Sequence, residues 1–202
     1  MLRVGGLLLE GSHLSRILVG VLVICGLTAG AYYRRQADKT REGMTASDGP
    51  FRVLRLIGLV FGGCLLTYLV APGWIGWASV GVPWGLRLTG VVVSIGSLPL
   101  LVWVFRSLQG NVTPTSATRA DHELVTNGPY HWIRHPLYTF AMAFWVGICL
   151  LAANWLLILL LAMAFLGVIL RTPREEERLI DEFGDEYRGY IERTGRFFPR
   201  LR

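Results

Sequence analysis

The sequence predicts an all-α membrane protein with about five transmembrane helices, and three observations lead to that prediction. Only 17% of the 202 residues are charged, whereas a soluble domain averages nearer a quarter. The hydrophobic residues, 52% of the chain, form long runs. The basic residues lie mainly at the ends of those runs. We therefore expect residues 1–202 to form a single integral membrane domain.

Five apolar runs are each close to the ~20 residues that a helix needs to cross the hydrocarbon core. The first three lie within residues 14–105 and predict three N-terminal transmembrane helices. The last two are separated only by a tight turn at Asn154, which predicts an antiparallel helical hairpin. The runs are Leu14–Tyr33, Val53–Ala71, Leu86–Phe105, Pro136–Ala153 and Trp155–Leu170.

The charges of the connections predict the orientation. Arginine is abundant in the first and third connections and after the last run, whereas Pro72–Gly85 has no charge and contains three tryptophans. Positive connections favour the cytosolic face, and tryptophan favours the interface. This alternation places the N-terminus outside and a C-terminal helix in the cytosol of a multi-pass cell-membrane protein.

Several classes of protein are disfavoured. Cys25, Cys64 and Cys149 each lie inside an apolar run, without the spacing of a metal site or a disulfide framework. The basic residues are spread over loops without an aromatic stacking platform, so a nucleic-acid partner is not expected. The runs hold almost no charge, which argues against a proton pump or an ion channel.

One candidate site segment follows the last apolar run. Thr172-Pro173-Arg174-Glu175 has the pattern of an N-cap, a first-turn proline and a capping-box glutamate. It predicts a helix that starts at Thr172 and runs to about Ile191. Glu176 lies in the middle of that helix's apolar face. A buried carboxylate needs a partner, so we expect Glu176 to meet either a structural arginine or a ligand, close to Arg134 and His135.

The other candidate segment is Asp121–Tyr138. A turn is expected at residues 127–129, and Pro136 suits the first position of a helix. Arg134 and His135 would then lie at the positive end of that helix, at membrane depth. Interfacial anchoring alone is an alternative explanation for these residue types.

The motifs in these two segments occur in a fixed order: His122-x-Leu124-Val125, Gly128-x-Tyr130, Arg134-His135-Pro136-x-Tyr138, Glu175-Glu176, Phe183-Gly184-x-x-Tyr187-x-x-Tyr190 and Arg196-x-x-Pro199. In this set the chain resembles the isoprenylcysteine carboxyl methyltransferases and their relatives among the phospholipid N-methyltransferases. The resemblance covers residues 119–202, with a helical hairpin between the two motif groups.

The resemblance implies a methyltransferase that binds S-adenosylmethionine on the cytosolic side and needs no metal. It implies a lipid-linked or prenylated acceptor that enters from the bilayer. Catalytic roles fall to Arg134 and to Glu176 or Glu175, with Arg134 able to hold a substrate carboxylate in a two-pronged hydrogen bond. Cofactor-binding roles fall to His122, Leu124, Val125, Gly128, Tyr130, His135, Pro136, Tyr138, Glu175 and Glu176.

The acceptor is left open. A carboxylate such as that of isoprenylcysteine needs no base, whereas a phospholipid amine needs Glu176 or His135 to accept a proton. Sterol-reductase-like hydride transfer from NADPH is a further alternative, because those enzymes share a similar motif. A lipid-binding scaffold, with Arg134 and Glu176 as a structural ion pair, is the non-enzymatic one.

Overall fold

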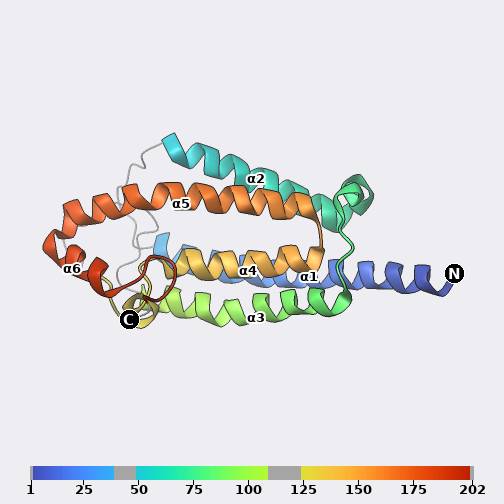
Figure 1. The fold of residues 1–202 in the computed structure, drawn as a ribbon, viewed down its shortest axis with the longest axis horizontal. Helices are drawn as coiled ribbons and strands as arrows, with labels where there is room; N and C mark the ends of the chain where they lie inside the picture. Colours follow the sequence, from blue (N-terminus) through green and yellow to red (C-terminus); the bar gives the residue numbers. More distant parts are fainter. Residues whose placement is uncertain (1, 39–48, 109–123, 201–202) are drawn as a thin grey trace.

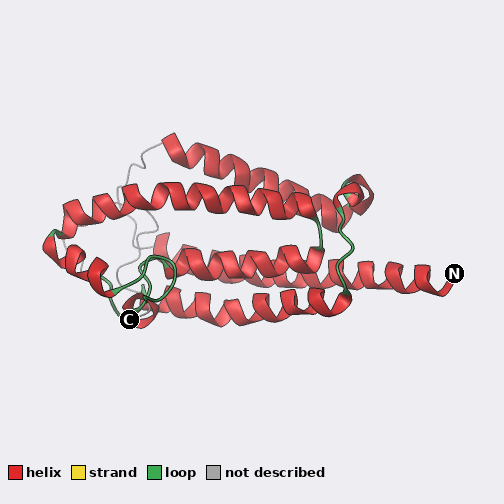
Figure 2. Ribbon diagram, viewed as in Figure 1, coloured by secondary structure: helices red, strands yellow, loops and turns green. Residues whose placement is uncertain are grey.

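The computed structural model describes residues 2–38, 49–108 and 124–200. Those residues form a bundle of long helices with short connecting turns and no strand (Figure 2). The all-α prediction is confirmed. The helices are α1 (Leu2–Asp38), α2 (Gly49–Val70), α3 (Trp84–Ser107), α4 (Pro136–Ala152), α5 (Trp155–Phe183) and α6 (Asp185–Arg193), and the 3₁₀ turns are η1 (Pro72–Trp74), η2 (Gly76–Ala78) and η3 (Gly128–His131).

Four of these helices are long and apolar enough to cross a membrane: His13–Tyr33 within α1, Arg52–Val70 within α2, α3 and α5. Helix α4 is apolar but has only 17 residues. Many large apolar side chains on these helices are exposed, such as Leu59, Val92 and Leu166, as expected of surfaces that face lipid tails. The chain is thus a polytopic membrane protein, and each predicted run lies on one helix.

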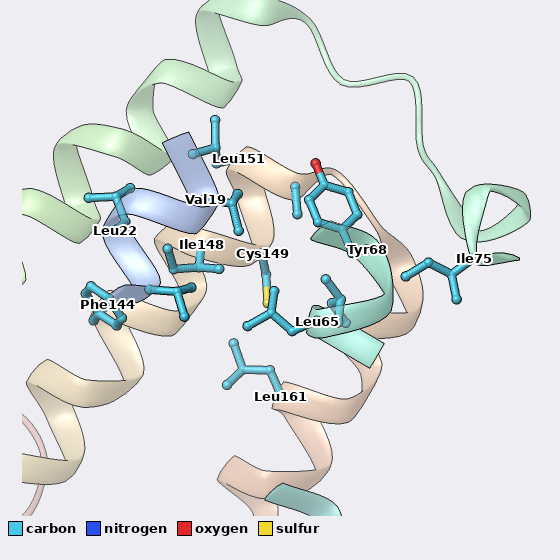
Figure 3. Close-up of a cluster of buried hydrophobic side chains, with 13 residues drawn as sticks. Val19, Leu22, Leu65, Tyr68, Ile75, Phe144, Ile148, Cys149, Leu151 and Leu161 are labelled. Atoms are coloured by element: carbon cyan, nitrogen blue, oxygen red, sulfur yellow. The ribbon is translucent and has the colours of Figure 1, made fainter. Parts of the chain in front are cut away.

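The helices lie side by side along the long axis of the molecule (Figure 1). Helix α4 packs closely on α3, α1 contacts both of them, and α2 packs on α5. A core cluster joins α1, α2, α4 and α5 (Figure 3), and it includes Val19, Leu65, Ile148 and Leu161. Apolar contacts therefore join these four helices in the part of the bundle that lies toward the turn between α4 and α5.

Glycine and serine allow the close contact between α3 and α4. A Cβ atom on Gly90 would lie 2.5 Å from the carbonyl oxygen of Gly147, so the two backbones approach at these positions. Nearby, the Ser94 hydroxyl donates to the Phe144 carbonyl at 3.1 Å. Small residues and interhelical hydrogen bonds of this kind commonly hold membrane helices together.

The predicted hairpin of α4 and α5 is present. Helix α4 ends at Ala152, and the next residue, Ala153, has a left-handed φ of 48°. Asn154 then caps α5, because its Oδ1 accepts from the amides of Leu156 and Leu157 at 3.1 and 3.2 Å. Its Nδ2 also donates to the Ile75 carbonyl at 3.2 Å. The hairpin tip is thereby fixed to the connection between α2 and α3.

The predicted helix start at Thr172 is wrong. Helix α5 runs through Thr172 and Pro173 to Phe183, and it accommodates a proline that lacks an amide hydrogen bond and crowds the preceding turn. The Thr172 hydroxyl donates to the Val168 carbonyl one turn earlier, at 2.8 Å. The helix breaks instead at Gly184, whose φ is 55°, and α6 follows.

Candidate functional site

The candidate site forms where four segments meet at the end of the bundle opposite the hairpin tip (Figure 1). They are η3 with the start of α4, the charged end of α5, helix α6, and residues 194–199, which we call the strap. Three backbone hydrogen bonds join the strap to the residues before α4. The Arg134 amide donates to the Gly195 carbonyl at 2.8 Å, the His135 amide to the Arg196 carbonyl at 3.0 Å, and the Gly195 amide to the Trp132 carbonyl at 3.1 Å.

Glu176 is the hub of the site. Its side chain is only 6% exposed, and its Oε1 accepts from Arg134 Nε at 2.9 Å. Its Oε2 accepts from Arg196 Nη2, and His135 Nε2 lies 3.5 Å from Oε1. The expectation that Glu176 faces inward toward Arg134 and His135 is confirmed. Two guanidinium partners offset the desolvation of this carboxylate.

Arg134 also holds α6 and the strap. Its side chain is 8% exposed, and its Nη1 donates to the carbonyls of Ile191 and Thr194 at 3.1 and 2.5 Å. Nε and Nη1 are therefore engaged inside the protein. Only Nη2 has no hydrogen-bond partner among the described residues, so the two-pronged substrate contact would require an internal bond to break.

Glu175 does not cap a helix start, contrary to the prediction. Its Oε2 accepts from the Tyr138 hydroxyl at 3.0 Å, and Arg171 Nη2 lies 3.9 Å away. Its side chain is 22% exposed, unlike that of Glu176. Of the two carboxylates, Glu175 is the one that a ligand can reach without breaking the arginine pairs.

An aromatic surface lies beside these carboxylates. The His135 ring stacks on Tyr138, with centroids 5.6 Å apart and planes 12° apart, and the Phe197 ring is 5.9 Å away. His135 Nε2 is the one buried side-chain nitrogen or oxygen in the described part of the chain that lacks a hydrogen bond. A buried polar atom of this kind calls for a partner, and a bound ligand would supply one.

Tyr190 of α6 supports η3 at Tyr130. The Tyr190 hydroxyl donates to the Tyr130 carbonyl at 2.6 Å. Burial raises the pKa of both phenols well above the usual value, so both are neutral at physiological pH. Gly128, with φ of 58°, packs so closely on Ser107 and Trp103 that a Cβ atom would overlap the Ser107 hydroxyl. The positive φ and this close packing therefore explain why position 128 is a glycine.

The structure describes most of the other expected site residues but not all of them. Pro136 is the first residue of α4, as predicted, and Leu124 and Val125 are partly buried. His122 lies outside the described residues. The residues that sequence reasoning did not assign to the site are in the strap: Thr194, Arg196 and Phe197. The Arg196-x-x-Pro199 motif was the available signal, but the spacing alone does not reveal that Arg196 meets Glu176.

These residues fit S-adenosylmethionine, judged by their chemistry. The aromatic faces of Tyr138 and Phe197 suit a sulfonium cation. Glu175 offers a carboxylate oxygen to an ammonium group or to ribose hydroxyls. His135 Nε2, which makes no hydrogen bond of good geometry but lies 3.5 Å from Glu176 Oε1, offers a further polar contact. The donor and acceptor set therefore matches the predicted cofactor.

Comparisons with known proteins place the chain among methyltransferases. Residues 86–186, half of the chain, match the phospholipid methyltransferase family model. The nickel-cobalt-cadmium resistance protein NccN of Alcaligenes xylosoxydans xylosoxydans is 39% identical over 83 residues, which are 41% of this chain and 39% of that protein. The cobalt-zinc-cadmium resistance protein CzcN of Cupriavidus metallidurans is 35% identical over 83 residues, 41% of this chain and 38% of that protein.

Methanethiol S-methyltransferase 1 of Bradyrhizobium diazoefficiens is 39% identical over 71 residues, 35% of this chain and 24% of that protein. The matched segments thus span less than two fifths of each of these three relatives. Among solved structures, the eukaryotic intramembrane Ras methyltransferase ICMT (isoprenylcysteine carboxyl methyltransferase) aligns with a TM-score of 0.49 and 22% identity, over 77% of this chain and 54% of that one. By the family match, this chain belongs to the phospholipid methyltransferase family, as its motifs predicted.

Proposed function

We propose that this protein transfers a methyl group from S-adenosylmethionine to the carboxylate of a lipid-linked acceptor similar to isoprenylcysteine, at the cytosolic face of the membrane. The observation that carries the proposal is a pair of guanidinium groups, those of Arg134 and Arg196, converging on one carboxylate beside the His135–Tyr138 aromatic pair. Guanidinium is the side-chain group that best recognises a carboxylate.

The cofactor would lie against Tyr138 and His135. S-adenosylmethionine supplies an electrophilic methyl group on a sulfonium centre. Tyr138 and Phe197 would supply aromatic faces for the sulfonium, and Glu175 would accept hydrogen bonds from the polar groups of the cofactor. Arg134 and Glu176 hold the strap and His135 in place around it. This assigns cofactor binding mainly to Glu175, and the organisation of charge around the site to Arg134 and Glu176.

The reaction needs no proton transfer when the acceptor is a carboxylate. A carboxylate oxygen forms a bond to the methyl carbon as the carbon–sulfur bond breaks, and the electron pair of that bond stays on sulfur. The products are a methyl ester and a neutral thioether. Opposite charges cancel during this step, so fixed alignment in a site screened from water favours it.

An amine acceptor requires a group that takes up its proton. Glu176 is committed to two guanidinium groups, which leaves His135 as the remaining candidate named by the motif. This arrangement favours the carboxylate. The match to a methyltransferase family also favours methyl transfer over hydride transfer from NADPH.

A second candidate is a lipophilic thiol. It is favoured by one specific observation, the 39% identity over 71 residues to the protein named methanethiol S-methyltransferase 1. A thiolate, like a carboxylate, reacts as an anion that guanidinium groups can hold, but a thiol must first pass its proton to an acceptor such as His135.

Labelled methyl transfer tests the proposal. The protein in lipid discs is incubated with methyl-labelled S-adenosylmethionine and, in separate reactions, N-acetyl-S-farnesylcysteine, phosphatidylethanolamine or a long-chain alkyl thiol. We expect label in the farnesylcysteine, released as methanol by mild base because the product is an ester. Label in the amine or the thiol alone would overturn the acceptor assignment. Failure of calorimetry to detect binding of S-adenosylhomocysteine would overturn the methyltransferase function itself.

A further inference from the structure

Arg196 is the guanidinium in the site with the most unused hydrogen-bonding capacity. Its side chain is 42% exposed, whereas that of Arg134 is 8% exposed. Among the described residues its side chain makes one hydrogen bond, from Nη2 to Glu176. An arginine has five N–H donors, so most of those of Arg196 remain available to a ligand.

The strap fixes where Arg196 lies. The Arg196 carbonyl accepts from the His135 amide at 3.0 Å, and the next carbonyl along, that of Phe197, accepts from the Thr139 hydroxyl at 2.7 Å. The Phe197 ring lies between His135 and Phe165, with its centroid 5.9 and 6.1 Å from theirs. Arg196 is therefore held beside His135, and its guanidinium stays partly exposed while it pairs with Glu176.

This position is also the level at which a lipid headgroup would lie. Phe165 belongs to the apolar part of α5, whereas Glu175 and Glu176 belong to its charged end. Phe197 touches the first of these regions, and Arg196 pairs with the second. An acceptor whose tail lies among lipid-facing residues would thus present its headgroup to Arg196.

We infer that Arg196, rather than Arg134, is the specificity-determining residue that binds the anionic group of the acceptor. Arg134 is desolvated and its Nε and Nη1 are engaged. Arg196 keeps Glu176 on one nitrogen and offers the others to the acceptor. This inference rests on the proposed function and names the class of acceptor it selects, which is an anion.

Binding of a matched pair of acceptors tests the inference without turnover. The probes are N-acetyl-S-farnesylcysteine and its carboxamide, measured by calorimetry in lipid discs in the presence of S-adenosylhomocysteine. In Arg196→Gln we expect the Kd of the acid to rise by at least about tenfold, as for loss of a charge-assisted hydrogen bond. The Kd of the carboxamide should change less than about twofold. Arg196→Lys, which keeps the charge but loses the planar fork, should fall between.

Arg200→Gln is the matched control, because Arg200 is an exposed arginine just beyond the strap whose side chain donates to the Glu192 carbonyl. Its Kd values should equal those of the wild type. Equal weakening of the acid and the carboxamide by Arg196→Gln, or no weakening of either, would overturn the inference. Wild-type protein that binds S-adenosylhomocysteine but not the acid would also overturn it, while leaving the methyltransferase function intact. If Arg196→Gln does not fold, as judged by lost S-adenosylhomocysteine binding, the test uses Arg196→Lys instead. The Kd values of the acid and the carboxamide are then compared in the same way, and selective weakening of the acid is again the expected result.

Discussion

At the scale of single residues, the adjacent carboxylates of Glu175 and Glu176 have different surroundings and should have separable roles. Glu176 is buried between Arg134 and Arg196, whereas Glu175 is partly exposed and accepts from Tyr138. The helical periodicity of the sequence indicated that Glu176 faces inward. It did not indicate the role of Glu175, because that depends on α5 continuing as one helix.

Glu176→Gln should destabilise the protein by about 3 kcal/mol, because removing one partner from a buried charge cluster leaves the others unpaired. The fraction folded as a function of temperature or denaturant, in detergent, measures this effect. Glu177→Gln is the matched control, since Glu177 is exposed and its change should cost less than about 0.5 kcal/mol. Equal losses in the two variants would contradict a structural role for the buried carboxylate.

Glu175→Gln should weaken cofactor binding while leaving stability nearly unchanged, the opposite of what we expect for Glu176→Gln. The partly exposed pair of Glu175 with Arg171 is long, at 3.9 Å, and should contribute below about 1 kcal/mol to stability. If Glu175 binds polar groups of the cofactor, the Kd of S-adenosylhomocysteine should rise about tenfold, in line with the loss of a hydrogen bond to a charged group. Calorimetry and a melting curve on the same preparation separate affinity from stability. Unchanged affinity would remove Glu175 from the cofactor site.

Exchanging the charges of Arg134 and Glu176 tests the alternative that the protein is a lipid-binding scaffold in which these two residues form only a structural ion pair. In Arg134→Glu/Glu176→Arg, the new carboxylate would face the carbonyls of Ile191 and Thr194, which now accept from Arg134 Nη1. Two acceptors facing a carboxylate repel it, so the double variant should fold no better than the single ones. Recovery of wild-type melting behaviour would indicate that a simple ion pair is sufficient there.

At the scale of elements, the strap depends on a glycine at position 195. A Cβ atom there would overlap the carbonyl oxygen of Phe198, which is backbone and has little freedom to move away. Gly195→Ala should therefore displace the strap, lower the melting temperature and weaken S-adenosylhomocysteine binding. Gly189→Ala is the matched control, because a Cβ atom on Gly189 meets nothing within 4 Å and alanine favours α6 by about 0.5–1 kcal/mol. Tolerance of both changes would show that the strap is not tightly fixed.

The helices could be predicted from the sequence more completely than the helix boundaries and the contacts of the strap. Long apolar runs located the membrane helices, and the turn at Asn154 predicted the hairpin. Thr172-Pro173 was misread, because the same residues suit a helix start and a helix interior in which the threonine hydroxyl bonds the preceding turn. The strap was not predicted, because its contacts with Arg134 and His135 are backbone bonds between residues about 60 positions apart, which no periodicity records.

At the scale of the whole molecule, the site residues lie at one end of the bundle and the hairpin tip at the other (Figure 1). The charged end of α5, the start of α4 and the strap share the first end. The uncharged connection between α2 and α3 contacts the hairpin tip through Asn154. A membrane crossed by these helices would thus separate the arginine-rich end from the tryptophan-rich one.

Charge asymmetry predicts that the arginine-rich end faces the cytosol, and single-cysteine labelling measures this directly. Cys25, Cys64 and Cys149 are first replaced by alanine. Gly81→Cys and Glu177→Cys then introduce one thiol at either end, both at exposed positions. A membrane-impermeant maleimide should label Gly81→Cys in intact cells and Glu177→Cys only after permeabilisation. The reverse pattern would place the site outside the cell, where a cytosolic supply of S-adenosylmethionine does not reach it. That outcome would contradict the proposed location of the reaction.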